Sequence, residues 1–187
     1  YVDDDAVGDD DGSSWLNAFG NLPDALVVAR PGDEIRVAQG IYKPAQPDGD
    51  RGASFVIRDV VSLYGGYAGL GTADPDSRDP RRYETILSGD LNGNDTGGFD
   101  NPSRSDNSDH VVKNHRQDMY EVYALLDGFT ITGGHSDEQD WSGGAGLLLY
   151  NANYSVIRNC RFTKNYAAGS GGALHDSGSY NWILDRC

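Results

Sequence analysis

The sequence is poor in basic residues and contains no long apolar run. Its 187 residues include 15 lysines and arginines against 29 aspartates and glutamates, which gives a formal net charge of −14 at pH 7. Nucleic-acid phosphates bind clustered Lys and Arg side chains, so this balance argues against a nucleic-acid partner. No apolar stretch approaches the roughly 18 residues that a membrane-spanning helix needs, so no membrane span is expected. An acidic surface suits simple solubility, or a salty or calcium-containing medium.

Cysteines, histidine motifs and hairpin turns are also scarce. The two cysteines, Cys160 and Cys187, are too few to define a redox compartment. We expect them to pack as buried thiols, with a disulfide as the alternative. The four histidines lack HxH and HExxH spacing, so no zinc motif is present. What the sequence does contain is 25 glycines, and many Asp, Asn and Ser residues between short apolar runs. This composition predicts many strands joined by tight turns.

The N-terminal third of the chain begins with an Asp-rich loop and continues with a helix-like pattern. The apolar residues that recur at steps of three and four are Trp15, Ala18, Phe19, Leu22, Leu26 and Ala29. This spacing predicts a pair of short helices over one end of the fold. Pro23 is expected to open the second helix, with Leu22 packed beneath it.

Strands replace helices after residue 33. Strand-like segments occupy 34–42, 53–59, 60–69, 85–90, 110–114 and 122–134, and almost no connection between them looks helical. In the first segment the alternation places Ile35 and Val37 inside. Polar loops follow at 69–84 and 91–109.

Two internal alignments relate the later segments to one another. A shift of 27 residues lays 144–160 on 171–187, and a shift of 31 residues lays 126–134 on 157–165. The pairs that these shifts align are Leu147 with Leu174, Val156 with Ile183, Ile157 with Leu184, Cys160 with Cys187, Leu126 with Ile157, Phe129 with Cys160 and Ile131 with Phe162. Segments that repeat in this way predict strands that stack on one another, about 4.8 Å apart.

Glycine and asparagine exchange at two positions of the second alignment. Gly128 falls on Asn159, and Gly134 falls on Asn165. Both residue types tolerate the left-handed helical region, so we expect a left-handed corner at each position. In the third copy the first corner falls on Arg186, which adopts this conformation less easily. Short strands joined by such corners predict one coil of a β-solenoid.

Several of these segments carry a family resemblance. "LDGFTITGG", "GGAL", "IRNCRFTKN" and the N-terminal "YVDDDAVG" and "GDEIRVAQGIYKP" resemble right-handed parallel β-helix proteins of the pectate-lyase-like superfamily. More closely, they resemble bacterial secreted and surface proteins with GGA(I/L/V) and FxxN repeats, such as polymorphic outer-membrane proteins. The resemblance implies an all-β fold, a right-handed parallel β-helix (solenoid) with a short N-terminal helical cap. We expect a single domain over 1–187, with a cap at 1–33 and coils at 34–187 that continue in a longer protein.

The same resemblance sets the functional expectations. It implies a bacterial protein that is extracellular or on the cell surface, and the group includes adhesins, surface scaffolds and polysaccharide-degrading enzymes. We expect a noncatalytic structural or adhesive module, which self-associates through the solenoid ends as a scaffold or filament subunit, or binds surface glycans. The alternatives are a polysaccharide lyase or glycoside hydrolase on the same scaffold, or a simple glycan-binding module.

The sequence assigns no catalytic residue with any specificity. A lyase needs a basic residue, and the candidates are Lys113, Lys164, Arg158 and Arg161. A glycoside hydrolase needs two carboxylates that face one cleft, and the candidates are Asp127, Asp176 and Asp185. Aromatic residues that could stack on sugar rings, or that could pack under loops instead, are Trp141, Tyr150, Tyr154, Tyr166, Tyr180 and Trp182. A surface this acidic offers carboxylate pairs by chance, so neither enzymatic hypothesis is preferred.

Calcium is the only cofactor that the sequence suggests. The run "DLNGND" supplies Asp90, Asn92, Asn94 and Asp95, whose spacing resembles the front half of a calcium loop. A plain Asn/Asp/Gly turn is the alternative. The N-terminal carboxylates, Asp3, Asp5 and Asp9 among them, repel one another, and either a bound cation or disorder of the segment would relieve the repulsion.

Overall fold

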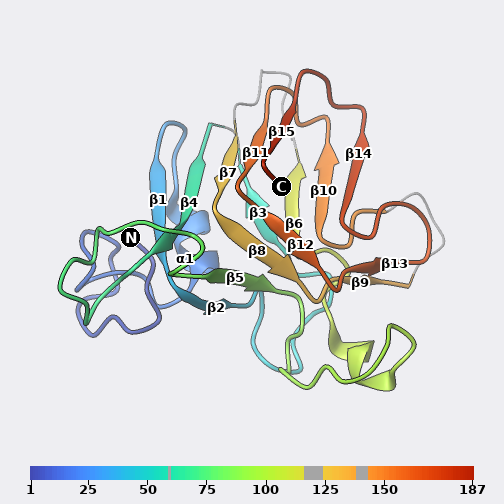
Figure 1. The fold of residues 1–187 in the computed structure, drawn as a ribbon, viewed down its shortest axis with the longest axis horizontal. Helices are drawn as coiled ribbons and strands as arrows, with labels where there is room; N and C mark the ends of the chain where they lie inside the picture. The colour runs from blue at the N-terminus through green and yellow to red at the C-terminus, as the bar shows by residue number, and fades with distance from the viewer. Residues whose placement is uncertain (59, 116–123, 138–142) are drawn as a thin grey trace.

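Parallel strands form most of the regular structure. The computed structural model describes residues 1–58, 60–115, 124–137 and 143–187 (Figure 1). In these residues every pair of neighbouring strands runs parallel. The described part of the chain contains one α-helix, α1 (Leu22–Val28), and one 3-10 helix, η1 (Pro102–Asp106). The fold is therefore all-β in its body.

The strands belong to four sheets. The first sheet has the order β1 (Glu34–Ala38), β4 (Ser62–Tyr67), β7 (Leu125–Asp127), β11 (Val156–Arg158) and β15 (Ile183–Asp185). The second has the order β2 (Gly40–Tyr42), β5 (Thr85–Ser88), β8 (Phe129–Thr132) and β12 (Arg161–Thr163). The third has the order β3 (Phe55–Ile57), β6 (Val112–His115), β10 (Leu147–Tyr150) and β14 (Leu174–Ser177), and the fourth pairs β9 (His135–Ser136) with β13 (Tyr166–Ala167).

The chain visits the first three sheets in rotation. Successive strands β1, β2 and β3 each enter a different sheet, and β4, β5 and β6 then pair with them in the same order (Figure 1). Each such passage is called a round below. The fourth sheet adds β9 and β13 between the second and third sheets of the later rounds.

The pairings between rounds confirm those predicted from the internal alignments. Leu126 pairs with Ile157 and Ile131 pairs with Phe162. The shift of 27 residues is confirmed as well, because Leu147 pairs with Leu174, Val156 with Ile183 and Ile157 with Leu184. The predicted strands at 34–42 and 122–134 are each divided, into β1 with β2 and β7 with β8, and residues 122 and 123 lie outside the described part.

The core lies between the sheets. Ile35 and Val37 are buried as predicted, and Leu63, Leu87 and Ile131 from later rounds are fully enclosed. These residues belong to one continuous apolar cluster that also includes the buried face of α1. Stacked rounds therefore bury one column of apolar side chains from Val2 to Cys160, and the last round covers its end with partly buried residues.

A polar row crosses the first sheet at a single register level. Its members, in sheet order, are Arg36, Tyr64, Asp127, Arg158 and Asp185. Side chains at one level of a parallel sheet are direct neighbours, so charges of opposite sign alternate in the later half of the row.

The first predicted corner is confirmed. Gly128 has φ 87° and Asn159 has φ 52°, both in the left-handed region. Arg186 also adopts φ 52°, so the third round turns the same corner despite its unfavourable side chain.

The second predicted corner is wrong by one residue. The left-handed residues are Gly133, with φ 77°, and Lys164, with φ 53°. Asn165 has a different role, because its Oδ1 accepts the N–H of Gly134 at 2.9 Å and its Nδ2 donates to the carbonyl of Ile131 at 2.9 Å. The asparagine therefore hydrogen-bonds to the backbone of the previous round, at a place where the strands leave groups unpaired.

The N-terminal region contains one helix, so the expectation of a helix pair is wrong. In α1 the side chain of Asn21 caps the N–H of Asp24, proline stands in the first turn and Leu22 is buried. The predicted first helix is a loop, because the carbonyls of Leu16 and Asn17 accept hydrogen bonds from upstream residues of the loop. Trp15 and Ala18 are nevertheless buried, so the apolar spacing correctly indicated burial although it does not form a helix.

Candidate functional site

Arginine side chains line a groove beside the second sheet. The groove, of about 700 Å³, lies between the loop 68–84 and the corners that lead from the first sheet into the second. Its lining includes four arginines, Arg78, Arg81, Arg161 and Arg186. We call this feature the arginine groove. It collects four of the 15 basic residues in a chain whose net charge is −14.

The floor of the groove consists of stacked corners from three rounds. Residues 128–130, 159–161 and 186 lie on it. Arg161 and Thr130 pair at one level of the second sheet, where Thr130 is buried and Arg161 is exposed. The hydroxyl of Thr130 donates to Glu84 Oε1 at 2.7 Å, and the largely exposed guanidinium of Arg161 lies 3.9 Å from the same oxygen. The floor therefore presents polar groups at a spacing set by the stacking of the rounds.

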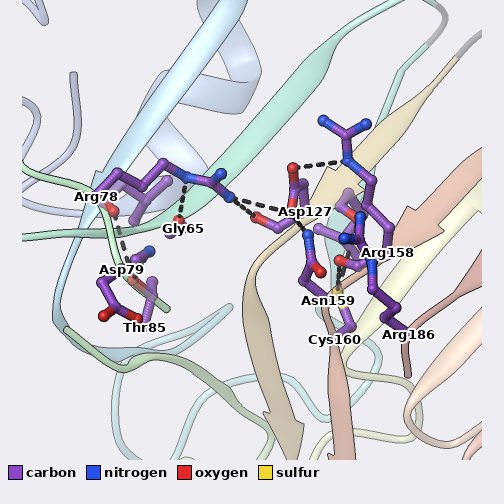
Figure 2. A network of polar contacts seen from close by, with 12 residues as sticks. Gly65, Arg78, Asp79, Thr85, Asp127, Arg158, Asn159, Cys160 and Arg186 are labelled. Atoms are coloured by element: carbon purple, nitrogen blue, oxygen red, sulfur yellow. Dashed lines mark hydrogen bonds and ion pairs between the residues drawn. The ribbon is translucent and has the colours of Figure 1, made fainter. Parts of the chain in front are cut away.

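The wall of the groove is the loop 68–84, which one arginine attaches to the sheet. Arg78 Nε donates to the carbonyl of Gly65 at 2.9 Å, and its Nη2 donates to the carbonyl of Asp127 at 3.1 Å (Figure 2). The same Nη2 lies 3.1 Å from Asp127 Oδ1. The loop approaches the sheet closely, because a Cβ at Gly66 or Gly128 would lie 2.7 or 2.8 Å from Pro80. Glycine is thus required where the wall meets the floor.

Asp127 is the buried charge behind the groove. Its carboxylate accepts Arg158 Nε at 2.8 Å and Asn159 Nδ2 at 2.7 Å, besides the contact with Arg78 (Figure 2). Burial favours the protonated form, but the hydrogen bonds from Asn159, Arg158 and Arg78 outweigh it and lower the pKa of Asp127 below its usual range. Asp127 therefore stays ionised, and a catalytic acid needs the opposite shift.

The other predicted catalytic residues are dispersed. Asp176 lies in β14 of the third sheet, whereas Asp127 and Asp185 share one level of the first sheet with Arg158 between them, so the three carboxylates are not on one face. Lys113 lies in β6 of the third sheet, where burial lowers its pKa. Lys164 occupies a left-handed corner. Of the four predicted bases, Arg161 lines the groove.

The groove offers cationic groups with spare hydrogen-bonding capacity. Among the described residues the Arg81 side chain has no ion pair or hydrogen bond. Arg186 is largely exposed, and within the described part of the chain its guanidinium pairs only with the adjacent Asp185, at 3.1 Å. Guanidinium groups bind carboxylate and sulfate through paired N–H donors. The arrangement is therefore chemically suited to an anionic ligand.

The residues of the first predicted calcium site serve mainly to fold their own loop. Asp90 accepts the backbone N–H groups of Gly93, Asn94 and Asp95 at 2.7–3.2 Å. Asn92 exchanges hydrogen bonds with Asp48, and Asp95 Oδ2 accepts Arg104 Nη1 at 2.7 Å. These contacts are those of an Asx-type turn stabilised by an ion pair. Calcium at Asp90, Asn92, Asn94 and Asp95 stays a prediction.

The N-terminal carboxylates are not gathered around one point either. Asp3 is buried, and its Oδ2 accepts the N–H of Leu70 at 2.6 Å. Burial raises the pKa of Asp3. Asp5 and Asp9 are exposed. Across the described residues no group of three or more His, Cys, Asp or Glu side chains is placed to hold a metal ion. Calcium at Asp3, Asp5 and Asp9 also stays a prediction.

The aromatic residues predicted for sugar stacking lie away from the groove. Tyr166 stacks between Phe99 and His135, with ring centroids 5.5 and 5.0 Å apart, and Tyr154 lies edge-on to Tyr180. Trp141 lies outside the described residues. The stacked rings therefore contribute to packing within the protein.

Sequence reasoning missed Arg78, Arg81 and Arg186 as a group. The loop 69–84 was expected only to be polar. One signal was present, because "SRDPRR" concentrates three arginines in a chain with few basic residues. The nearness of Arg186 to this loop depends on three-dimensional stacking, and no local pattern encodes it.

Comparisons with protein-family models, curated proteins and solved structures found no match for this chain. In the described residues no helix has the length and apolar character that crossing a bilayer requires.

Proposed function

We propose that the chain is a right-handed parallel β-helix with an N-terminal helical cap. Three features support this architecture. The strands enter three sheets in rotation, the partners in each sheet run parallel, and left-handed corners recur at Gly128, Asn159 and Arg186. A solenoid of this kind presents a long, regular face on which an extended ligand can lie.

We propose further that the protein is a noncatalytic, extracellular adhesive module that binds an acidic glycan in the arginine groove. The observation that carries this proposal is the concentration of four arginines along one groove of a strongly acidic chain. A polyanion is repelled by most of such a surface, and the groove is the local exception. Carboxylates spaced along a glycan would meet the guanidinium groups of Arg81, Arg161 and Arg186 in turn.

The carboxylates in and behind the groove are already engaged within the protein, which argues against a catalytic role for them. Glu84 accepts a hydrogen bond from Thr130, and Asp79 accepts the N–H of Arg81. The buried Asp127 is held ionised by its arginine partners. A polysaccharide lyase is the competing hypothesis, because Arg161 lines the groove. Release of unsaturated uronates from pectin or alginate, followed by ultraviolet absorbance with and without calcium, would overturn the noncatalytic assignment.

Binding measurements test the groove directly. The probe is polygalacturonate, titrated calorimetrically against the purified chain at low salt, with a neutral glucan of similar length for comparison. Replacement of Arg161 or Arg81 by glutamine removes one charged donor, so each variant is expected to bind about tenfold more weakly. Affinity should also fall as salt rises, because the contacts are ionic.

Arg82→Gln is the matched control for these variants. Arg82 is an exposed arginine next to Arg81, but it lies against Tyr83 and does not line the groove. The Arg82→Gln substitution changes the net charge by the same amount as Arg81→Gln or Arg161→Gln. Equal weakening by Arg82→Gln would mean that net charge alone governs binding, and equal affinity for the neutral glucan would reject an acidic ligand.

Surface location, adhesion and end-to-end self-association remain proposals. The outermost strand of the first sheet, β15, has Ile183 and Leu184 about half exposed. An uncovered strand edge pairs readily with another strand. Sedimentation analysis over a range of concentrations tests self-association, and a monomer at the highest concentration would argue against it.

A further inference from the structure

The two cysteines occupy equivalent positions in successive rounds. Each directly follows a left-handed corner, at Asn159 and at Arg186, both with φ 52°. The strands before these corners, β11 and β15, pair in register, and the N–H of Asn159 donates to the carbonyl of Asp185 at 3.0 Å. In-register neighbours lie about 4.8 Å apart. That separation falls within the Cα distances of about 4.4–6.8 Å that disulfides span.

The sulfur atoms are close to each other's backbone. The N–H of Cys160 donates to Cys187 Sγ at 3.4 Å. The Cys160 thiol approaches the carbonyl of Arg158 at 3.2 Å, and the Cys187 thiol approaches that of Asp185 at 3.4 Å. The two thiols therefore make the same contact with the residue two positions upstream, one round apart. Cys160 is buried and Cys187 is exposed, so they differ in access to solvent.

We propose that Cys160 and Cys187 form a dithiol pair that closes to an internal disulfide, with Cys187 as the attacking group. The bond covalently links two adjacent rounds at their corners. The bond lies at the floor of the arginine groove, which Cys160 lines, but its formation requires no ligand in the groove.

The oxidant is a small-molecule disulfide, such as oxidised glutathione. The Cys187 thiolate attacks one sulfur of this disulfide, forms a mixed disulfide and releases one small thiolate. The Cys160 thiol then gives its proton to a released thiolate or to water, and its sulfur attacks Cys187 Sγ. The mixed disulfide breaks and the second small thiolate leaves. Overall, the two cysteines lose two electrons and two protons, and the small disulfide is reduced to two thiols.

The acidities of the two groups agree with this order. A hydrogen bond from the Cys160 thiol, with a second from its backbone N–H, outweighs burial and lowers the pKa of Cys187 to about 6. The interaction with Cys187, together with burial, raises the pKa of Cys160. At neutral pH the exposed sulfur is thus the nucleophilic thiolate, and the buried sulfur is the resolving thiol.

Intact-mass measurement tests the bond. The reduced 187-residue chain is incubated with oxidised glutathione at pH 7, quenched with acid and weighed. We expect a monomer lighter by two hydrogen atoms, with a higher thermal midpoint than the reduced chain. A product that stops at the glutathione adduct, or that forms only intermolecular dimers, would overturn the proposal.

Two variants test which sulfur attacks. Cys160→Ala should accumulate the glutathione adduct on Cys187, and Cys187→Ser should remain unmodified because its remaining thiol is buried.

The rate of Cys187 alkylation by iodoacetamide should be half-maximal near about pH 6 in the wild type. In Cys160→Ala the midpoint should rise towards the ordinary thiol value of about 8.5. An unchanged midpoint would reject Cys160 as the partner. The wild-type mass decides the bond itself even if a variant folds poorly.

Discussion

Two long loops are each attached to the sheets by one arginine, and we call each attachment a junction. In one junction the most buried charged group is a carboxylate, and in the other it is a guanidinium. At the junction of the loop 68–84 the buried group is the carboxylate of Asp127, with 1% of its side chain exposed. Its partners Arg78 and Arg158 are 26% and 38% exposed. At the junction of the loop 89–111 the buried group is the guanidinium of Arg104, which is 5% exposed, while its partner Asp95 is 17% exposed.

The Arg104 junction differs because its loop supplies both the cation and the carboxylate partner. Arg104 belongs to η1, and its Nη1 binds Asp95 within the same loop. The remaining donors reach out of the loop, from Nη2 to the carbonyl of Lys164 at 2.8 Å and from Nε to His135 Nδ1 at 3.2 Å. At the Asp127 junction, by contrast, water can reach the arginines and partly replace a lost carboxylate. The comparison teaches that the cost of breaking each junction depends on the hydrogen bonds, from protein or from water, that the surviving partners still have.

The largest effect is expected from Arg104→Met. Methionine retains much of the apolar stem, but it leaves Asp95, His135 and the carbonyls of Lys164 and Gly134 with fewer partners in a buried setting. We expect a loss of about 3–5 kcal/mol in the free energy of unfolding, measured by urea denaturation. The matched variant Arg78→Met should lose about 2 kcal/mol, because the buried Asp127 keeps its hydrogen bonds from Arg158 and Asn159. Equal losses would show that burial does not distinguish the junctions.

Asp127→Asn should have the next largest effect. The asparagine amide group would direct N–H donors towards two guanidinium groups that are themselves donors. We expect a loss of about 2–3 kcal/mol in the free energy of unfolding. Asp185→Asn provides the control, since this exposed carboxylate pairs with an exposed Arg186 and should cost at most about 0.5 kcal/mol. A comparable loss in both variants would contradict the role of burial.

Acidification should affect the two junctions with opposite sign. The pKa of Asp127 is lowered because the hydrogen bonds from Asn159, Arg158 and Arg78 exceed the opposing effect of burial. Its contribution to stability is present above the unfolded value of about 3.9, and is lost as pH falls through the folded value. The pKa of Asp95 is raised by burial, so its folded form binds a proton more tightly. That group adds stability as pH falls from neutral through its folded pKa.

Urea denaturation at a series of pH values measures this difference. The stability gap between the wild type and Asp127→Asn should shrink below about pH 4. The wild type should gain stability relative to Asp95→Asn between neutral pH and about pH 4. Parallel curves for all three proteins would refute the opposite signs.

The smallest expected effects concern one asparagine beside each junction. Asn165→Gly removes two hydrogen bonds to the backbone and loosens the chain, so we expect a loss of about 2 kcal/mol. Asn159→Gly removes the hydrogen bond to Asp127, but glycine adopts the left-handed corner easily, so the loss should be about 1 kcal/mol. Thermal and urea denaturation of the two variants in parallel make this comparison. The reverse order would mean that the corner conformation matters less than the contact with Asp127.

The sequence allowed much of the sheet pairing to be predicted. Local patterns repeat wherever strands stack, so Leu126 could be matched to Ile157, and Gly128 to Asn159, without any three-dimensional information. The second corner was misplaced because Asn165 uses its side chain to hydrogen-bond to the backbone, and its neighbour Lys164 turns the chain. An asparagine alone does not reveal which of these roles it has.

The candidate site was largely beyond sequence reasoning. Arg78 and Asp127 are 49 residues apart, and their contact depends on the path of a loop that has no periodic pattern. The Asp-rich run at 90–95 looked like an ion site, yet backbone N–H groups and Arg104 occupy much of its capacity. Single-residue chemistry identifies groups that bind anions or cations, but the fold decides whether the protein itself already satisfies them.

The polar row across the first sheet favours one register of β11 on β7 over the alternatives. If β11 slipped by two residues along β7, its apolar side chains would still point inward. The free energy of apolar burial would therefore distinguish the two registers only weakly. Asp127 would then face Val156 or the region of Cys160 in place of Arg158, and a desolvated carboxylate would lose a partner. The polar row thereby destabilises shifted strand registers that hydrophobic burial alone would tolerate.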